Sequence, residues 1–290
     1  MNNYRILTDS SCDLTPALAA SLELTVLPLS VTIGEDTYAN YLDEREITFR
    51  DCYDALRAGK PSKTSAANVD AFLQVMDPIL AAGEDILYLG FSSGLSGTYN
   101  AGCIAAEQMR EKYPERKIYC VDTLAASLGQ GLLIYLTVEK KRAGATVEQA
   151  RDFAEETKLH VAHWFTVDDL NHLRRGGRVS ATSAVLGTML SIKPVLHMDD
   201  EGHLIFMEKV RGRKTSIKRM LEKMRESVVN PDGQTVFISH GDCIEEAEYL
   251  AARVREEWAV KDVIINYVGP VIGAHAGPGV IALFFLGTKR

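Results

Sequence analysis

A serine flanked by glycines stands where a strand is expected to give way to a helix. The Gly-x-Ser-x-Gly pattern of the nucleophile elbow, whose serine hydroxyl attacks an acyl carbon, occurs at Gly90-Phe91-Ser92-Ser93-Gly94. A serine hydrolase also needs a general base, and the sequence does not single out any of the seven histidines for that role. Alternatively, the turn opens a helix and offers backbone N–H groups to an anion. Further hydroxyl side chains follow in Leu95-Ser96-Gly97-Thr98. A single nucleophile does not need so many hydroxyl groups, so the segment favours anion binding.

A second group of hydroxyl side chains precedes another expected helix, at Lys63-Thr64-Ser65-Ala66-Ala67-Asn68. Thr64 or Ser65 could act simply as the helix N-cap, which is the default role of such residues. The first expected strand ends in a similar way at Thr8-Asp9-Ser10-Ser11-Cys12-Asp13, with Asp9 as an acceptor that would organise the loop. Because ligands gather at the carboxyl edge of a parallel sheet, we expect these loops to form one anion-binding site.

Two short segments concentrate positive charge in a chain whose formal net charge is −7. Three arginines surround Gly176-Gly177, and a second cluster is Val210-Arg211-Gly212-Arg213-Lys214. Arginines before a glycine pair can simply complement the dipole at a helix end. The other interpretation is a local basic surface that docks a phosphate or an acidic partner. His160 and His163 lack a third ligand at a useful spacing, so we expect no metal site.

The elements that must position these residues alternate between strand and helix in the first half of the chain. Strands are expected at 4–8, 24–33, 85–91 and 117–121, helices at 48–59, 69–82, 96–112 and 125–142, and a further helix is expected to begin at Pro16. Short apolar segments separated by helices indicate a parallel sheet that is covered on both faces. Thr15-Pro16 has the residues typical of an N-cap and a first helical position. We therefore expect an N-terminal three-layer α/β/α domain with a parallel sheet over residues 1–155.

The second half mixes parallel and antiparallel signals. A capping box at Thr146-Val147-Glu148-Gln149 predicts a helix to about Leu159. Strands at 192–198 and 203–211 flank an acidic turn and predict a β-hairpin. Further strands are expected at 163–167, 235–240 and 262–268, and further helices at 214–228 and 245–258. We expect a C-terminal two-layer α/β domain with a mixed sheet over residues 156–290, and a ligand cleft between the two domains.

Composition narrows the class of protein. The 290 residues are 46% hydrophobic and 24% charged, as in ordinary globular proteins, and the acidic balance argues against nucleic-acid binding. The five cysteines include no closely spaced pair, and the first residues lack the apolar region of a signal peptide, so we expect a cytoplasmic protein with free thiols. The segment 263–288 has no charged side chain but contains several glycines and prolines. The glycines and prolines favour buried strands on either side of a loop with His275, and they argue against a membrane span.

Together these segments resemble the DegV family of bacterial fatty-acid-binding proteins, which are the FakB-type partners of fatty acid kinase. The matching stretches follow one another along nearly the whole chain: Thr8-Asp9-Ser10, Leu27-Pro28-Leu29-Ser30-Val31, Thr64-Ser65, Ser92-Ser93-Gly94-Leu95-Ser96-Gly97-Thr98-Tyr99, Val167-Asp168-Asp169-Leu170, Gly177-Arg178-Val179, Lys193-Pro194-Val195-Leu196, and Gly269-Pro270 with His275. One departure is Ala66-Ala67, where the family often has a Gln-Pro pair.

The resemblance implies two α/β domains that bury a long-chain fatty acid between them, with no cofactor and no metal. Its carboxylate would be bound by Thr64 with Ser65, by Ser93 or Ser96 or both, and by His275. In the family, a fatty acid kinase phosphorylates the bound carboxyl group for phospholipid metabolism, so the chain would present substrate and catalyse nothing. Arg178 and Arg211 are the candidates for docking the kinase or binding the phosphorylated head group. One alternative is a serine esterase that uses Ser92 or Ser93. Another is an enzyme that acts on a phosphosugar or on dihydroxyacetone, because the fold resembles that group of kinases.

Overall fold

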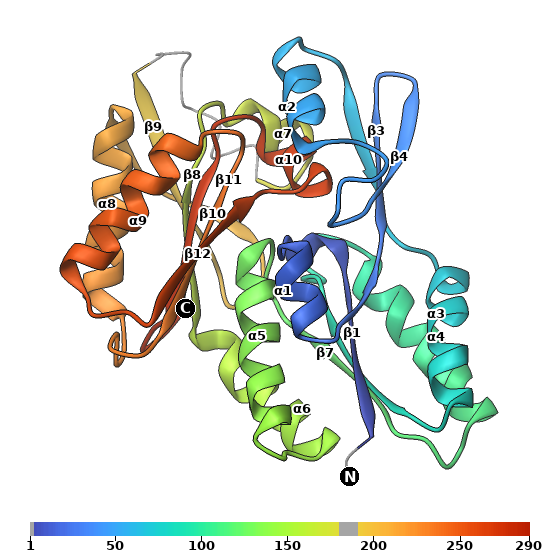
Figure 1. Cartoon of the computed structure of the whole chain (residues 1–290). Coiled ribbons are helices and arrows are strands. Elements are labelled where there is room, and N and C mark those ends of the chain that lie inside the picture. The colour runs from blue at the N-terminus through green and yellow to red at the C-terminus, as the bar shows by residue number, and fades with distance from the viewer. Residues whose placement is uncertain (1–2, 180–190) are drawn as a thin grey trace.

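The computed structural model describes residues 3–179 and 191–290, and within these ranges the strands form three sheets. A four-stranded parallel sheet belongs to the first half of the chain, and a six-stranded mixed sheet belongs to the second. A small three-stranded sheet stands beside both (Figure 1). The parallel sheet and the mixed sheet confirm the expected fold class.

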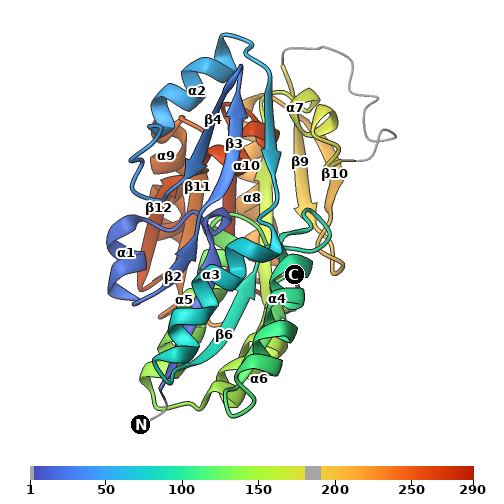
Figure 2. The same ribbon diagram turned by 90° about the vertical axis from the view of Figure 1, so that its right-hand side faces the viewer.

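The parallel sheet has the strand order β2-β1-β6-β7, and its core strands are almost wholly buried. Helices α3 and α4 pack on one face, and α5 and α6 pack on the other, which gives the expected three layers (Figure 2). The strands are β1 (Tyr4–Asp9), β2 (Thr25–Leu27), β6 (Asp85–Gly90) and β7 (Ile118–Asp122). The helices are α1 (Pro16–Ser21), α3 (Val69–Ala81), α4 (Thr98–Lys112), α5 (Leu128–Arg142) and α6 (Val147–Thr157), with 3-10 turns η1 (Ser10–Cys12) and η2 (Lys158–His160).

Helix starts follow the capping residues of the sequence. Thr15 accepts a hydrogen bond from the Leu18 N–H, and Pro16 occupies the first position of α1. Thr146 and Gln149 form the predicted capping box of α6. Each cap satisfies N–H groups that a helix leaves without partners, so these boundaries could be predicted within a few residues.

The six-stranded sheet has the order β10-β9-β8-β13-β11-β12, and its only parallel pair among the described strands is β11 with β12. The predicted hairpin is β9 with β10, whose register pairs Met198 with Leu204. The strands are β8 (Val161–Thr166), β9 (Ile192–Met198), β10 (Leu204–Arg211), β11 (Thr235–His240), β12 (Asp262–Tyr267) and β13 (Ile281–Leu286). Helices α8 (Arg213–Ser227) and α9 (Ile244–Glu257) cover its outer face (Figure 1).

Helix α5 also packs on the inner face of this six-stranded sheet, against β8, β11 and β13. It therefore lies between the parallel sheet and the mixed sheet and contributes to the apolar core of both. The sequence did not indicate this shared role, because α5 is apolar around much of its circumference and carries no clear one-sided pattern. The division of the chain at residues 155 and 156 stays a prediction.

The third sheet was not predicted. It consists of β3 (Leu29–Ile33) with β4 (Asp36–Asn40) and β5 (Ser62–Ser65) as antiparallel neighbours, and α2 (Phe49–Arg57) packs on it. The single strand expected at 24–33 is wrong, because it divides at Pro28, which has no N–H to donate to a ladder. The N-cap role for Thr64 or Ser65 is also wrong, since both lie in β5 and Asn68 caps α3.

The charge-free C-terminal segment forms β12, a short helix α10 (Pro270–Ala276) and β13. The loop expected around His275 is therefore a helix, with Pro270 at its first position and Gly277 in the left-handed region at its end. Helix α10 packs against strands β3 and β5 of the small sheet and against helix α2 (Figure 2). In the described ranges, none of the helices has the length and apolarity needed to span a bilayer.

Candidate functional site

The principal candidate site is a cavity between the three sheets, with about 970 Å³ of empty space, a figure that includes open solvent at its mouth. Its walls come from both halves of the chain and are mostly apolar, which is typical of a small-molecule site. The apolar lining residues are Leu29, Ala66, Phe91, Leu95, Ala126, Phe165, Leu173, Met198, Leu204, Val268, Val271, Ile272, Ala276, Val280, Ala282 and Phe284. Such a cavity accommodates a flexible apolar chain.

A threonine and a histidine from distant parts of the sequence meet in the cavity wall. Thr64 Oγ1 lies 2.8 Å from His275 Nε2, and both side chains line the cavity together with Ser65. The contact forms because α10 packs across β5, 211 positions away in the chain. Burial and the nearby Arg178 lower the pKa of His275 to about 4, so its ring is neutral at pH 7.

The other imidazole nitrogen of His275 is enclosed. Nδ1 is buried and has no hydrogen-bond partner among the described residues. It lies beside Gly176, where a Cβ would collide with the ring. With Nδ1 as the bare nitrogen, Nε2 carries the proton and donates to Thr64 Oγ1, which leaves the Thr64 hydroxyl hydrogen for a ligand.

Ser96 and Gly97 complete the polar part of the wall at the start of α4. Ser96 Oγ lies 2.9 Å from Thr98 Oγ1, and Thr98 Oγ1 accepts a hydrogen bond from the Ala67 N–H at 3.3 Å. The loops after β5 and β6 are therefore joined by Thr98. This bond joins the two hydroxyl clusters of the sequence. The expectation that both lie at the carboxyl edge of the parallel sheet is wrong for Thr64 and Ser65, which belong to β5 of the small antiparallel sheet, and only the cluster after β6 follows a parallel strand.

The structure separates the serines of the glycine-flanked motif. Ser92 is fully buried, donates to the Gly202 carbonyl at 2.8 Å and accepts from the Gly94 N–H at 3.2 Å. Ser93 is exposed and is not among the residues that line the cavity. Among the described residues, no histidine hydrogen-bonds to either serine hydroxyl.

The two arginines proposed for docking occupy different places. Arg178 is half-buried in the cavity wall, where it donates to the carbonyl groups of Leu95, at 3.2 Å, and of Gly176. Its burial lowers the pKa of the guanidinium from its usual value. Arg211 is exposed at the end of β10 and does not line the cavity. Arg178 is therefore a positive charge beside Ser96 and His275, whereas Arg211 belongs to the surface.

Asp9 has the loop-organising contacts expected from the sequence. Its buried carboxylate accepts hydrogen bonds from the N–H groups of Ser11, at 3.2 Å, and Phe91, at 3.1 Å. Burial raises the pKa of Asp9, and these donors oppose the effect. Asp9 thereby joins the loops after β1 and β6. Among the residues that the structure describes, no group of three or more potential metal ligands occurs.

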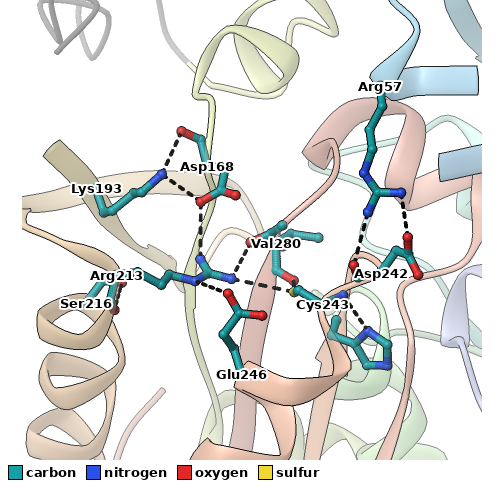
Figure 3. Close-up of polar contacts among 11 residues, drawn as sticks. Arg57, Asp168, Lys193, Arg213, Ser216, Asp242, Cys243, Glu246 and Val280 are labelled. Carbon is teal, nitrogen blue, oxygen red and sulfur yellow. Dashed lines mark hydrogen bonds and ion pairs between the residues drawn. The ribbon is translucent and has the colours of Figure 1, made fainter. Parts of the chain in front are cut away.

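A polar cluster holds the connection from α10 to β13 in place (Figure 3). Arg213 donates to the Gly279 carbonyl at 2.6 Å, and the Cys243 thiol donates to the Val280 carbonyl at 3.4 Å. Lys193 forms an ion pair with Asp168 at 2.7 Å, beside the Arg213 guanidinium (Figure 3). Because this connection follows His275 directly, the cluster also helps to fix the position of α10.

Three polar side chains in the cavity wall were not singled out as ligand contacts by the sequence: Ser127, His163 and Ser239. Ser127 precedes α5 with φ at +53°, an unusual conformation for a residue with a side chain. None of the three belongs to a motif quoted above, so only the tertiary structure places them at the cavity.

Sequence comparison assigns the chain to a family along its whole length. The model described as "Uncharacterised protein, DegV family" matches residues 3–288. A DegV domain-containing protein of Clostridium perfringens is 44% identical over 290 residues, which is 100% of this chain and 99% of that protein. One from Lactococcus lactis is 37% identical over 99% of this chain and 98% of its own.

Solved structures give the same result. A DegV family protein of Thermus thermophilus, described by its fatty acid binding, has a TM-score of 0.88 at 29% identity, covering 98% of this chain and 99% of its own. DegV of Bacillus subtilis, described as a fatty acid binding protein, has a TM-score of 0.86 at 27% identity, covering 99% of this chain and 100% of its own. With this sequence match, this fold and a cavity of this kind, the chain belongs to the DegV family.

Proposed function

We propose that this protein binds a long-chain fatty acid, with the acyl chain in the apolar cavity and the carboxylate at Thr64, Ser65, Ser96 and His275. The observation that carries the proposal is the Thr64–His275 hydrogen bond in the wall of a mostly apolar cavity. The apolar residues that make up most of the lining suit an acyl chain, and the polar group at Thr64, Ser96 and His275 suits its head group.

The acyl chain supplies most of the binding free energy in this proposal. Burying one methylene contributes about 0.8 kcal/mol, so about fifteen of them give roughly 12 kcal/mol before the costs of association. The lining phenylalanine, leucine, isoleucine and valine side chains provide the apolar surface for this burial. The head group then sets the position of the chain along the cavity.

The carboxylate is an acceptor only, so the head-group site must supply donors. In our proposal, Thr64 donates its hydroxyl hydrogen while it accepts from His275 Nε2, and Ser96 supplies a second hydroxyl. Arg178 lies close enough to His275 to depress the pKa of that ring, and its guanidinium provides the countercharge. The neutral imidazole suits this arrangement, because it donates without adding a second buried charge.

We further propose that a fatty acid kinase acts on the bound carboxyl group and forms the acyl phosphate, as in the family this chain resembles. The chain itself then presents the substrate, and Ser92 is a structural residue whose hydroxyl donates to a carbonyl group. The exposed Arg211 is our candidate contact for the kinase, and Arg178 faces the head group.

The test begins with protein purified from its native host, denatured and extracted, with the extract analysed by mass spectrometry. We expect a long-chain fatty acid at near-equal stoichiometry, and uptake of added palmitate or oleate by the stripped protein. No co-purifying acid together with no uptake would refute fatty acid binding. A separate incubation with a fatty acid kinase and ATP tests presentation: acyl phosphate should form only when the kinase and this protein are both present.

A further inference from the structure

Two cysteines outside the fatty acid site lie next to each other on the face of the parallel sheet that α3 and α4 cover. Cys103 belongs to α4, and Cys120 belongs to β7, the last strand in the order of that sheet. Both residues are partly exposed free thiols, and neither lines the cavity. Any reaction of these thiols is therefore separate from the binding of a fatty acid.

The packing of α4 on β6 and β7 brings the two cysteines to the same level of the sheet. Tyr88 of β6 pairs with Cys120, and a Cβ at Gly102 of α4 would lie 2.5 Å from the Tyr88 ring. Because it has no Cβ, Gly102 lets the helix approach the strands closely beside Cys103. Cys120 faces α4, since it packs with Tyr88 in one apolar cluster while its neighbour Val121 belongs to the cluster on the other face.

Side chains of α4 hold the helix on β7 before and after Cys103. The Tyr99 hydroxyl, one turn earlier, donates to the Cys120 carbonyl at 3.4 Å. The Arg110 guanidinium, about two turns later, donates to the Ile118 carbonyl at 2.7 and 3.1 Å. With the helix fixed on both sides, the two thiols face each other within hydrogen-bonding distance.

The surroundings make Cys103 the more acidic of the two thiols. The hydrogen bond with the Cys120 thiol lowers the pKa of Cys103 and outweighs the effect of burial, and Tyr99 and the positive charge of Arg110 add to the lowering. The same hydrogen bond and burial raise the pKa of Cys120. At neutral pH, Cys103 therefore holds more of the thiolate, which is the form that attacks an oxidant.

We propose that Cys103 and Cys120 form a reversible disulfide when the protein meets hydrogen peroxide, with Cys103 as the attacking sulfur and Cys120 as the resolving one. The Cys103 thiolate attacks one oxygen of the peroxide, the O–O bond breaks, and the sulfur is oxidised to a sulfenic acid. The other oxygen leaves as hydroxide, which takes up the proton that Cys103 gave and becomes water.

In the second step, the Cys120 sulfur attacks the sulfenic sulfur, so that an S–S bond forms and the S–O bond breaks. The leaving oxygen departs as water with the Cys120 proton. Two thiols and one peroxide thus give one disulfide and two waters, and a dithiol reductant reverses the reaction. The sulfurs must approach from hydrogen-bonding distance to a bond length of about 2.05 Å, which is a short movement.

The other cysteines offer no comparable pair and should stay reduced. Cys12 and Cys52 are fully buried, and burial raises the pKa of both thiols, to about 12 for Cys52. Cys243 is partly exposed, but its thiol donates to the Val280 carbonyl at 3.4 Å, and burial raises its pKa to about 12. Cys243 is therefore a matched control for a thiol of similar exposure.

The experiment treats the reduced, unmodified protein with a small excess of hydrogen peroxide at pH 7, alkylates the remaining thiols in denaturant and maps the peptides by mass spectrometry. Trypsin cleaves after Arg110 and Lys117, between the two cysteines, so the disulfide gives one cross-linked peptide pair. We expect this pair, with the other three cysteines alkylated and with dithiothreitol restoring both thiols. Oxidation that stops at a sulfenic or sulfinic acid on Cys103, or that leaves both cysteines alkylated, would overturn the proposal.

Two variants assign the roles of the sulfurs, and the peptide map of the unmodified chain tests the disulfide even where a variant fails to fold. In Cys120→Ala, Cys103 should accumulate as a sulfenic acid that dimedone traps. In Cys103→Ala, peroxide should oxidise Cys120 at least tenfold more slowly than it oxidises Cys103 in the unmodified protein. Cys243→Ala should form the disulfide at the unmodified rate. Equal rates in Cys103→Ala, or loss of the disulfide in Cys243→Ala, would refute the assignment.

Discussion

The hydroxyl of Thr64 offers the sharpest test of the head-group site, and Thr64→Val removes it with little change in shape. Valine keeps the β-branched side chain that suits β5, where Thr64 pairs with Val31 of β3. In our proposal, the substitution removes both the acceptor for His275 Nε2 and a hydroxyl that donates to the carboxylate. The apolar part of the cavity is unchanged.

The expected loss follows from the charge of the ligand. A hydrogen bond to a charged group contributes about 1.5–3 kcal/mol, whereas one between neutral groups contributes about 0.5–1.5 kcal/mol. At about 1.4 kcal/mol per factor of ten, a carboxylate should bind roughly 10- to 150-fold more weakly to Thr64→Val. The methyl ester of the same acid, which carries no charge, should lose no more than about tenfold.

The assay is calorimetric titration of stripped protein with palmitate and with methyl palmitate. Thr37→Val serves as the matched control, because Thr37 belongs to the same small sheet, is exposed, and does not line the cavity. We expect the control to bind both ligands as the unmodified protein does. Equal losses for palmitate and its ester in Thr64→Val would show that Thr64 supports the fold of the wall and not the carboxylate.

Three further predictions concern other polar groups of the fold. Arg178→Gln should weaken palmitate binding more at low ionic strength than at high ionic strength, because it removes the positive charge opposite the carboxylate. If the loss of affinity in the same titration does not depend on the salt concentration, Arg178 supports packing of the wall instead. Burial raises the pKa of Asp13 from 3.8 to about 8. The folded state therefore binds the carboxyl proton of Asp13 more tightly than the unfolded state does, and the free energy of unfolding falls as the pH rises from about 4 to about 8. Urea unfolding from pH 5 to 8 should therefore show Asp13→Asn gaining stability over the unmodified protein by up to roughly 1.4 kcal/mol per pH unit; a constant difference would contradict this. Ser92→Ala should lower the midpoint of thermal unfolding, and the unmodified protein should not react with a fluorophosphonate probe; labelling at Ser92 would revive the esterase hypothesis.

Local sequence signals predicted the regular elements well. The cap at Thr15, the capping box at Thr146 and the hairpin turn at 199–202 each involve residues within a few positions of one another, and all three are confirmed. The fold class was also predictable, because alternation of apolar strands and helices indicates a parallel sheet. The third sheet was missed, since its strands β4 and β5 are mostly polar and partly exposed and do not show a buried-strand pattern.

The site could be predicted only in part. Thr64, Ser65, Ser96 and His275 were named from motifs, and all four line the cavity. Their roles at the carboxylate stay predictions until a ligand is tested. The helix that carries His275 was missed because its glycines and prolines are typical of a loop, and tertiary packing against β3 and β5 outweighs that tendency. Ser239 and His163 gave no local signal, because their place at the cavity depends on strand pairing across the second half of the chain.

The position of α5 between two sheets bears on how a ligand exchanges. Because one helix contributes to the cores of both sheets, parting the sheets would expose apolar surface on each and would be slow. Helix α10 packs on β3, β5 and α2, and among the described residues its side-chain hydrogen bonds with β5 join Thr64 to His275 and Ser62 to the Ala274 carbonyl. Since Thr64 and His275 join β5 to α10 in the cavity wall, we expect substitutions of these proposed head-group residues to change the rate of ligand release as well as the affinity.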